Sequence, residues 1–271
     1  MQYILTHIAL KVTVLLISLA GVTMNNSKVT GLKRVVLISG KSEIGLAILD
    51  NLPLLEVEEI VFVGRDLDES MFRERFTNCN LVLVEHDFTR NFEIAEIIAQ
   101  IYSHGCIDLA IIATGVNGPT PGSETAEDIA LVTSINFISP AAFISGFAER
   151  MVGIGTGRIL VVSSMSSVRP HVQNFIYSST KAGLDFFSRG YQNYLRKSGV
   201  TLTILKPGLV LTQLSRGKNP LPFTLSAEAV GKIGATAVLA GKEVVYAPKF
   251  LSLIAKLLLG LPNFLFQRIG R

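Results

Sequence analysis

The hydrophobic positions of this chain form two kinds of pattern, which alternate along the sequence. Unbroken runs rich in Val, Ile and Leu occupy residues 34–39, 59–63, 81–85, 107–113, 159–162, 200–205 and 243–246. Such runs are typical of strands that are buried on both faces of a sheet. Between them lie longer segments with apolar residues at helical spacing, the longest at 125–151. The chain is therefore predicted to alternate strand and helix.

That alternation predicts an α/β fold, a single Rossmann-type doubly wound parallel sheet of about seven strands with helices on both faces. We see no internal repeat and no linker, and 271 residues suit one large domain. We place the catalytic domain at 33–248. It lies between an apolar N-terminal extension, 1–32, and an apolar, basic C-terminal tail, 249–271.

The first predicted strand leads into a glycine turn, Gly40-Lys-Ser-Glu-Ile-Gly45, and a helix is expected from Leu46. A strand, a glycine turn and a helix in this order direct backbone N–H groups and a helix N-terminus at a pyrophosphate. The turn therefore predicts a dinucleotide site.

The segment 158–181 carries the candidate catalytic groups. Its strand ends in Ser163 and Ser164, and the next helix bears Tyr177 and Lys181 at positions i and i+4, on one face. An ammonium beside a phenol would lower the pKa of the tyrosine, so that it exchanges a proton with a substrate oxygen near neutral pH. Ser164 would donate a second hydrogen bond to that oxygen. Alone, this spacing is more often a surface pair.

When several motifs are considered together, the chain resembles the short-chain dehydrogenase/reductase family over roughly 33–248. The motifs are Tyr177-x-x-x-Lys181, Ser164, Asn136 on the preceding helix, and Pro207-Gly208-x-Val210-x-Thr212. The resemblance implies that Tyr177 donates or accepts the proton, while Lys181 lowers its pKa and holds the nicotinamide ribose. It also implies that Ser164 orients the carbonyl and that Asn136 supports a water in a proton relay.

The same resemblance implies an NAD(P)H cofactor. In the family, an acidic residue at the end of the second strand selects NAD, and an arginine just beyond it favours NADP. Here Gly64 holds the acidic position and Arg65 follows, which favours NADP, although Asp66 could swing in. Asp87 and Phe88 are expected to border the adenine. The expected cofactor contacts are Ser39, Gly40, Ser42, Ile44, Gly45, Arg65, Asp87, Phe88, Gly115, Tyr177, Lys181, Pro207 and Gly208.

The chain departs from the family in two places. The usual turn reads Thr-Gly-x-x-x-Gly-x-Gly, whereas Ser39 stands at the first glycine here and Glu43 at the middle one. We expect Glu43 to face away from the pyrophosphate, because the two would repel. Ala113-Thr114-Gly115 replaces the family's Asn-Asn-Ala-Gly. A weakened turn would suit a cofactor-binding scaffold subunit with little turnover, but the complete set of catalytic residues favours an enzyme.

Three runs, 42–47, 174–185 and 241–248, resemble a narrower group in this family, the decaprenylphosphoryl-2-keto-β-D-erythro-pentose reductases. The resemblance implies reduction of a polyprenyl-phosphate keto-sugar to its arabino epimer, for cell-wall arabinan, with NADH as the usual cofactor. It also implies a flavin-dependent oxidase partner that makes the ketone. Arg169, Arg216 and Lys218 are candidates for binding the substrate phosphate. The alternative is a general ketoreductase of another lipid or acyl carbonyl.

The composition of the chain limits the kinds of molecule that it is expected to bind. Hydrophobic residues make up 49% of the chain and the mean hydropathy is +0.45, high values for a soluble enzyme. The net charge of +4 is too small and too scattered for nucleic acid. Cys79 and Cys106 lack metal-ligand spacing, so we expect no metal and no disulfide.

The apolar excess lies at the two ends. The run 12–22 resembles a signal-peptide core, and the alternative is that translation starts at Met24. The tail 249–271 contains four basic residues and no acidic one, and Gly260 and Pro262 interrupt it. We expect it to anchor the enzyme peripherally to the cytoplasmic side of a membrane. Alternatively, the enzyme is soluble and the tail covers the substrate cleft or a partner in a homo-oligomer.

Overall fold

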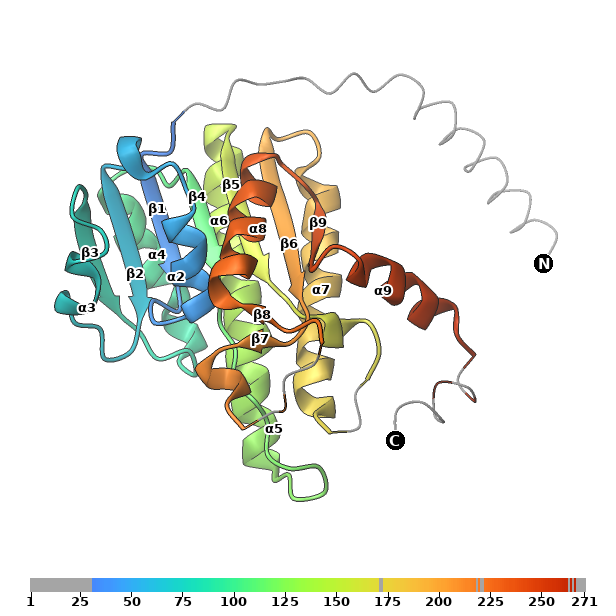
Figure 1. Cartoon of the computed structure of the whole chain (residues 1–271). Coiled ribbons are helices and arrows are strands. Elements are labelled where there is room, and N and C mark those ends of the chain that lie inside the picture. Colours follow the sequence, from blue (N-terminus) through green and yellow to red (C-terminus); the bar gives the residue numbers. More distant parts are fainter. Residues whose placement is uncertain are drawn as a thin grey trace, which may run out of the picture. The chain divides into compact units, whose positions relative to one another are not determined.

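The computed structural model describes residues 31–170, 173–217, 219, 222–262, 264 and 266. Their centre is a seven-stranded sheet in the order β3-β2-β1-β4-β5-β6-β9, with every neighbouring pair parallel. Because the order runs outward from β1 and from β4, the direction of winding reverses between these two strands (Figure 1). The strands are β1 Arg34–Ile38, β2 Glu59–Gly64, β3 Asn80–Glu85, β4 Leu109–Ile112, β5 Gly157–Val162, β6 Val200–Pro207 and β9 Val244–Ala247.

Helices cover both faces of the sheet, so the predicted doubly wound fold is confirmed. One face is packed by α2 and α8, and the other by α4, α6 and α7. The α-helices are α2 Glu43–Asp50, α3 Ser70–Arg73, α4 Ile94–Ser103, α5 Ala126–Thr133, α6 Ser139–Ile154, α7 Phe175–Leu195, α8 Ala227–Leu239 and α9 Leu251–Gly260. The short elements are η1 Leu54–Glu56, η2 Asn91–Glu93, η3 Ser134–Ile138, η4 Met165–Ser167, η5 Gln213–Ser215, β7 Val210–Leu211 and β8 Leu225–Ser226.

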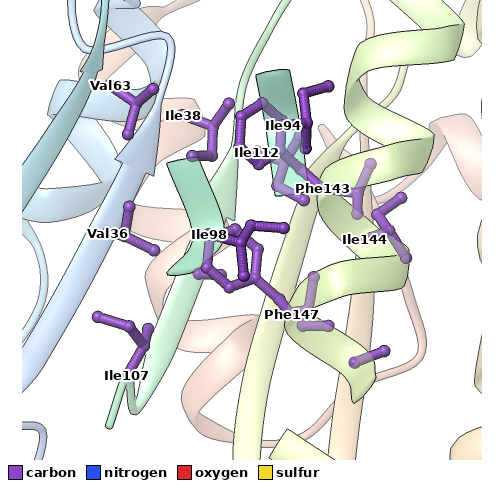
Figure 2. Close-up of a cluster of buried hydrophobic side chains, with 14 of the residues drawn as sticks. Val36, Ile38, Val63, Ile94, Ile98, Ile107, Ile112, Phe143, Ile144 and Phe147 are labelled. Atoms are coloured by element: carbon purple, nitrogen blue, oxygen red, sulfur yellow. The ribbon is translucent and has the colours of Figure 1, made fainter. Parts of the chain in front are cut away.

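Alternate residues of the strands enter the two cores, which explains the unbroken apolar runs. In β1, Val36 and Ile38 face α4 and α6, where Figure 2 shows them with Phe143 and Phe147. Val35 and Leu37 face the opposite layer. Each fully buried side chain of this size stabilises the fold by about 1.5–3 kcal/mol.

The helix predicted at 125–151 is continuous but not uniform. Thr125 caps α5 through a capping box with Asp128, and α6 ends at Gly155, whose φ is 83°. Between α5 and α6 lies η3, one wider π-helical turn. The whole helix, 126–154, is long and apolar enough to cross a membrane. Its buried face packs into the core beside the sheet, so it serves as a core helix.

Several element boundaries differ from the prediction, among them the starts of α2 and β4. α2 begins at Glu43 and not at Leu46, because the Ser42 side chain accepts a hydrogen bond from Gly45 N (3.2 Å) and caps the helix early. β4 begins at Leu109 and not at Ile107, and the carboxylate of the preceding Asp108 accepts hydrogen bonds from the backbone N–H groups of Lys33 (2.8 Å) and Arg34 (2.9 Å). The N-terminal run 12–22, Met24 and Lys218 lie outside the described residues.

Candidate active site

The predicted catalytic residues meet where β4 and β5 end, at the carboxyl edge of the sheet. Ser164 follows β5 and is buried, and its Oγ accepts a hydrogen bond from Ser166 N (3.1 Å). The Ser164 hydroxyl interacts with the hydroxyl of Tyr177, which lies in the first turn of α7. The edge of a parallel sheet and the start of one helix therefore bring the two hydroxyl groups together.

Lys181 lies one turn further along α7 and is 2% exposed. Its Nζ donates hydrogen bonds to the carbonyl oxygens of Thr114 (2.9 Å) and Val162 (3.1 Å), at the ends of β4 and β5. Burial lowers the pKa of this ammonium to about 8, because few water molecules solvate the charge. Lys181 thus holds α7 across two strand ends.

The pKa of Tyr177 is raised in the structure, whereas the sequence predicted that Lys181 would lower it. Burial raises the pKa of the phenol, and the hydrogen bond with Ser164 opposes this shift without reversing it. The Lys181 ammonium lies 5.8 Å from the centroid of the phenol ring and is directed at the two carbonyl oxygens. The phenol therefore keeps its proton at neutral pH, which is the form that a proton donor needs.

Asn136 connects three segments around this pair. It lies in the π-helical turn η3 and is fully buried. Its Oδ1 accepts from Val116 N (2.8 Å), and its Nδ2 donates to Val116 O (2.9 Å) and Thr180 Oγ1 (3.3 Å). Thr180 Oγ1 in turn donates to Tyr177 O (2.8 Å). Asn136 therefore fixes the chain after β4 against α7, and its contact with a relay water stays a prediction.

The glycine turn keeps its backbone shape despite its two substitutions. Ser39, at the first glycine position, has φ 75°, in the left-handed region that favours glycine. Ser39 N and Gly40 N both donate to Val63 O (2.9 Å each). A Cβ on Gly45 would lie 2.6 Å from Leu37 Cδ1 and 3.2 Å from Ala113 Cβ, so a larger residue would displace side chains where α2 approaches the sheet. The turn and the N-terminus of α2 thus fit a dinucleotide pyrophosphate.

Glu43 has a partner that the sequence did not predict. Its Oε2 accepts a hydrogen bond from Gln213 N (2.7 Å) in η5. A second hydrogen bond holds η5 from the chain after β4, where Asn117 Nδ2 donates to Leu214 O (2.6 Å). The carboxylate therefore binds η5. Through these two hydrogen bonds, η5 bridges α2 and the chain after β4. These two segments lie on either side of the point where the direction of winding reverses. No sequence signal indicated Asn117 or Leu214, because neither contact is local.

Charged side chains surround the ends of β1 and β2, where the adenosine half of a dinucleotide is expected. Arg65 Nη1 lies 3.8 Å from Asp87 Oδ2, and Lys41 Nζ donates to Asp66 O (3.3 Å). Lys41 was not predicted, although its place in the glycine turn was a usable signal. Phe88, expected at the adenine, instead buries its side chain in the core, edge-on to His86 and Phe143.

The substrate candidates are placed differently from one another. Arg169 Nε donates to Leu258 O (3.0 Å) and Nη2 to Leu261 O (2.6 Å), at the C-terminal end of α9. These bonds place the guanidinium at the end of a helix, and its role as a phosphate ligand stays a prediction. Arg216 is exposed at the end of η5. Pro207 ends β6, and Gly208 N donates to Ala247 O (2.9 Å) beside α9.

Comparison with known proteins agrees with this geometry. Residues 33–221 match the family described as short chain dehydrogenase. The chain belongs to this family. It is therefore an NAD(P)-dependent oxidoreductase. It is 30% identical over 251 residues to an uncharacterized oxidoreductase of Mycobacterium tuberculosis, a match that covers 89% of this chain and 99% of that one.

Solved structures share the fold. A short-chain dehydrogenase from Sphingobium yanoikuyae in complex with NADPH has a TM-score of 0.74 and 22% identity, covering 87% of this chain and 96% of that one. A 3-oxoacyl-[acyl-carrier protein] reductase from Brucella melitensis in complex with NAD has a TM-score of 0.72 and 19% identity, covering 83% and 98%. Neighbours of the same fold thus bind either cofactor.

Proposed function

We propose that this enzyme uses NAD(P)H to reduce the ketone of a lipid-linked sugar, a decaprenylphosphoryl-2-keto-pentose, to the arabino alcohol. The observation that carries the proposal is the pair of interacting hydroxyl groups of Ser164 and Tyr177 beside the buried Lys181, whose ammonium lies 5.8 Å from the centroid of the phenol ring. Two hydroxyl donors that converge at a sheet edge can bind one carbonyl oxygen. A phenol that is protonated at neutral pH can then neutralise the alkoxide as it forms.

Each residue has one part in the reduction. When bound, the nicotinamide supplies the hydride that reaches the carbonyl carbon. Tyr177 gives its phenolic proton to the carbonyl oxygen, so that one C=O bond becomes one CH–OH group. Ser164 donates a hydrogen bond to the same oxygen, an effect worth roughly two powers of ten in rate for comparable donors. Lys181 keeps a positive charge beside the phenol ring.

NADPH is the cofactor that the charges favour. Lys41 and Arg65 bring two cations to the ends of β1 and β2, where the 2′-phosphate of NADPH would lie. The neighbouring Asp66 and Asp87 would favour the free 2′-hydroxyl of NADH, but each lies close to one of these cations.

The substrate assignment is supported by the runs 42–47, 174–185 and 241–248, which resemble the keto-pentose reductases. Leu211 in β7 and Leu214 in η5 are exposed apolar residues, and they suit a substrate with a hydrocarbon tail. They also suit a second candidate, a ketoreductase of another lipid or acyl carbonyl. A flavin-dependent oxidase is the partner that would produce the keto-pentose.

The test combines the full chain with NADPH and a polyprenylphosphoryl riboside that a flavin-dependent oxidase converts to the 2-keto form. We expect formation of the arabinoside with matching consumption of NADPH, measured by mass spectrometry and absorbance. Tyr177→Phe should lower turnover by about three powers of ten or more while cofactor binding stays unchanged, because one proton donor is lost.

Two results would count against the proposal. Reduction of aliphatic or acyl ketones without any reduction of the keto-pentose would favour the second candidate. A Tyr177→Phe variant as active as the wild type would remove Tyr177 from the proton transfer.

A further inference from the structure

We propose that α9 is a lipid-binding foot, which docks on an anionic bilayer surface and is tied by Arg169 to the segment that carries Ser164. The foot is defined by Lys249, Phe250, Leu253, Lys256 and Leu257. The proposal goes beyond the reaction, because it does not depend on which ketone the enzyme reduces.

The foot presents apolar side chains to solvent. Leu253 and Leu257 are 61% and 65% exposed, and Phe250 is also exposed. Positions 250, 253 and 257 fall on one face of a helix. On the opposite face Ala255 is buried, and Leu251 packs against Gly208, where a Cβ would lie 2.9 Å from Leu251 Cδ1. A surface helix normally turns polar residues outward, so this second apolar face marks an interaction surface.

The basic residues beside the apolar face favour an anionic lipid surface as its partner. Lys249 and Lys256 are exposed and lie along one side of the apolar face, and residues 249–262 include no Asp or Glu. Apolar side chains flanked by lysines on one helix are typical of segments that lie in the headgroup region of anionic membranes. A second copy docked symmetrically on this face would bring lysines of like charge together. With ten residues, α9 is too short to span a bilayer and would lie on it.

The apolar surface continues toward the active site. The rings of Phe250 and Phe223 meet edge to face, with centroids 4.7 Å apart, and Phe223 is 57% exposed. Phe223 belongs to the segment between η5 and β8, and η5 is hydrogen-bonded to Asn117 beside the strand ends. A bilayer under α9 would therefore also meet Phe223, on the segment that follows η5.

Arg169 connects the foot to the catalytic loop. It follows η4, whose N-cap is Ser164, and its guanidinium holds Leu258 O and Leu261 O. A cation at the last carbonyl oxygens of a helix also meets the negative end of the helix dipole. The first residue of α9, Leu251, packs on Gly208, and the carbonyl oxygens at its other end bind Arg169. Both ends of α9 therefore contact segments that leave the sheet next to the catalytic residues. Docking would thus hold these segments against the membrane surface.

Sedimentation of the full chain with vesicles tests the foot. The vesicles contain phosphatidylcholine alone or phosphatidylcholine with phosphatidylglycerol. We expect the wild type to sediment with the anionic vesicles and the double variant Leu253→Asp/Leu257→Asp to bind at least tenfold more weakly. Lys249→Glu/Lys256→Glu should lose the preference for anionic vesicles. Phe186→Asp is the matched control, because Phe186 is 82% exposed on α7 and should leave binding unchanged.

Three results would overturn the foot. One is a wild type that stays in the supernatant with both vesicles, and another is equal sedimentation of the wild type and the leucine variant. The third is a wild-type dimer that the leucine substitutions convert to a monomer, without vesicle binding, which would assign the face to a second copy. Because none of these measurements requires turnover, their failure is distinct from failure of the proposed reaction.

Hydrogen exchange tests the tie through Arg169. On addition of anionic vesicles, we expect slower amide exchange in α9 and in residues 164–170 of the wild type. In Arg169→Ala only α9 should gain protection, and Arg169→Lys should restore part of the effect by keeping the charge. Equal protection of residues 164–170 in the wild type and in Arg169→Ala would overturn the tie.

Discussion

At the scale of single residues, burial sets the chemistry of the site. Lys181 and Tyr177 both lie in a poorly solvated place, which disfavours the charged form of each. The pKa of the lysine falls to about 8, while the pKa of the phenol rises. The pair therefore holds a phenol in its protonated form beside an ammonium whose pKa is about 8.

The lowered pKa of Lys181 predicts how stability depends on pH. In the unfolded chain this lysine titrates near 10.5, and in the fold at about 8. Between these values the unfolded state binds more protons, so stability rises with pH, and below about 8 the full cost of burying the ammonium remains. In urea unfolding without cofactor, the wild type should gain on the order of 3 kcal/mol relative to Lys181→Met between pH about 7.5 and 10.5. A constant difference would mean that Lys181 is not desolvated.

Arg65 predicts a difference between the two cofactors. Its guanidinium can form paired hydrogen bonds with the 2′-phosphate of NADPH, which NADH lacks. Arg65→Ala should raise the Kd for NADPH roughly tenfold or more, and that for NADH by less than about twofold, measured by fluorescence titration. Arg73→Ala is the control, since Arg73 pairs with Glu69 on α3. Equal losses for both cofactors would show that Arg65 does not contact the 2′-phosphate.

At the scale of elements, the early start of α2 has a consequence for the segment that bridges the site. Because the helix begins at Glu43, the carboxylate of this residue stands at the helix N-terminus and reaches Gln213 N. A residue that replaces a glycine of the family motif thus gains a structural contact to η5.

Removal of that contact should loosen η5. Glu43→Ala leaves Gln213 N without its acceptor, so amide exchange at Gln213 and dissociation of bound NADPH should each accelerate by about fivefold, as for a lost hydrogen bond of about 1 kcal/mol. Hydrogen exchange and stopped-flow fluorescence measure the two rates. Glu58→Ala is the matched control, because this exposed carboxylate pairs with Lys33. Unchanged rates in Glu43→Ala would show that the contact does not restrain η5.

At the scale of the whole molecule, α7 must stay registered on the sheet for the site to exist. Four turns of this helix carry Tyr177, Lys181, Asp185 and Arg189 at spacings of four along one face. Asp185 Oδ1 lies 2.8 Å from Lys206 Nζ, and Lys206 is buried on β6. This ion pair holds the catalytic helix against β6, the strand beside β5.

The loss of Asp185 should therefore destabilise the whole fold. Asp185→Ala leaves the Lys206 charge buried without its carboxylate, which typically costs about 3–5 kcal/mol. Arg189→Ala removes the half-exposed partner of the same carboxylate and should cost less than about 1 kcal/mol. Urea unfolding of both variants measures the difference. Similar costs for the two would contradict the dominant role of the buried pair.

The sequence by itself determined which segments form strands and which form helices, and that the two alternate along the chain. Apolar runs marked the strands because both faces of a parallel sheet are buried, and the spacing of Tyr177 and Lys181 placed them on one helix face. The glycine turn 40–45 was recognisable because it stands between an apolar run and a helical pattern. These features depend on residues that are near one another in the chain.

Only the tertiary structure decided which partner each polar side chain meets. Glu43 binds Gln213, 170 positions away, and Arg169 binds Leu258, 89 positions away. Lys181 turns to two strand-end carbonyl oxygens, so the pKa of Tyr177 rises where the spacing alone predicted a fall. The physical reason is that periodicity encodes which face of an element is buried, whereas hydrogen bonds and desolvation depend on what packs against that face.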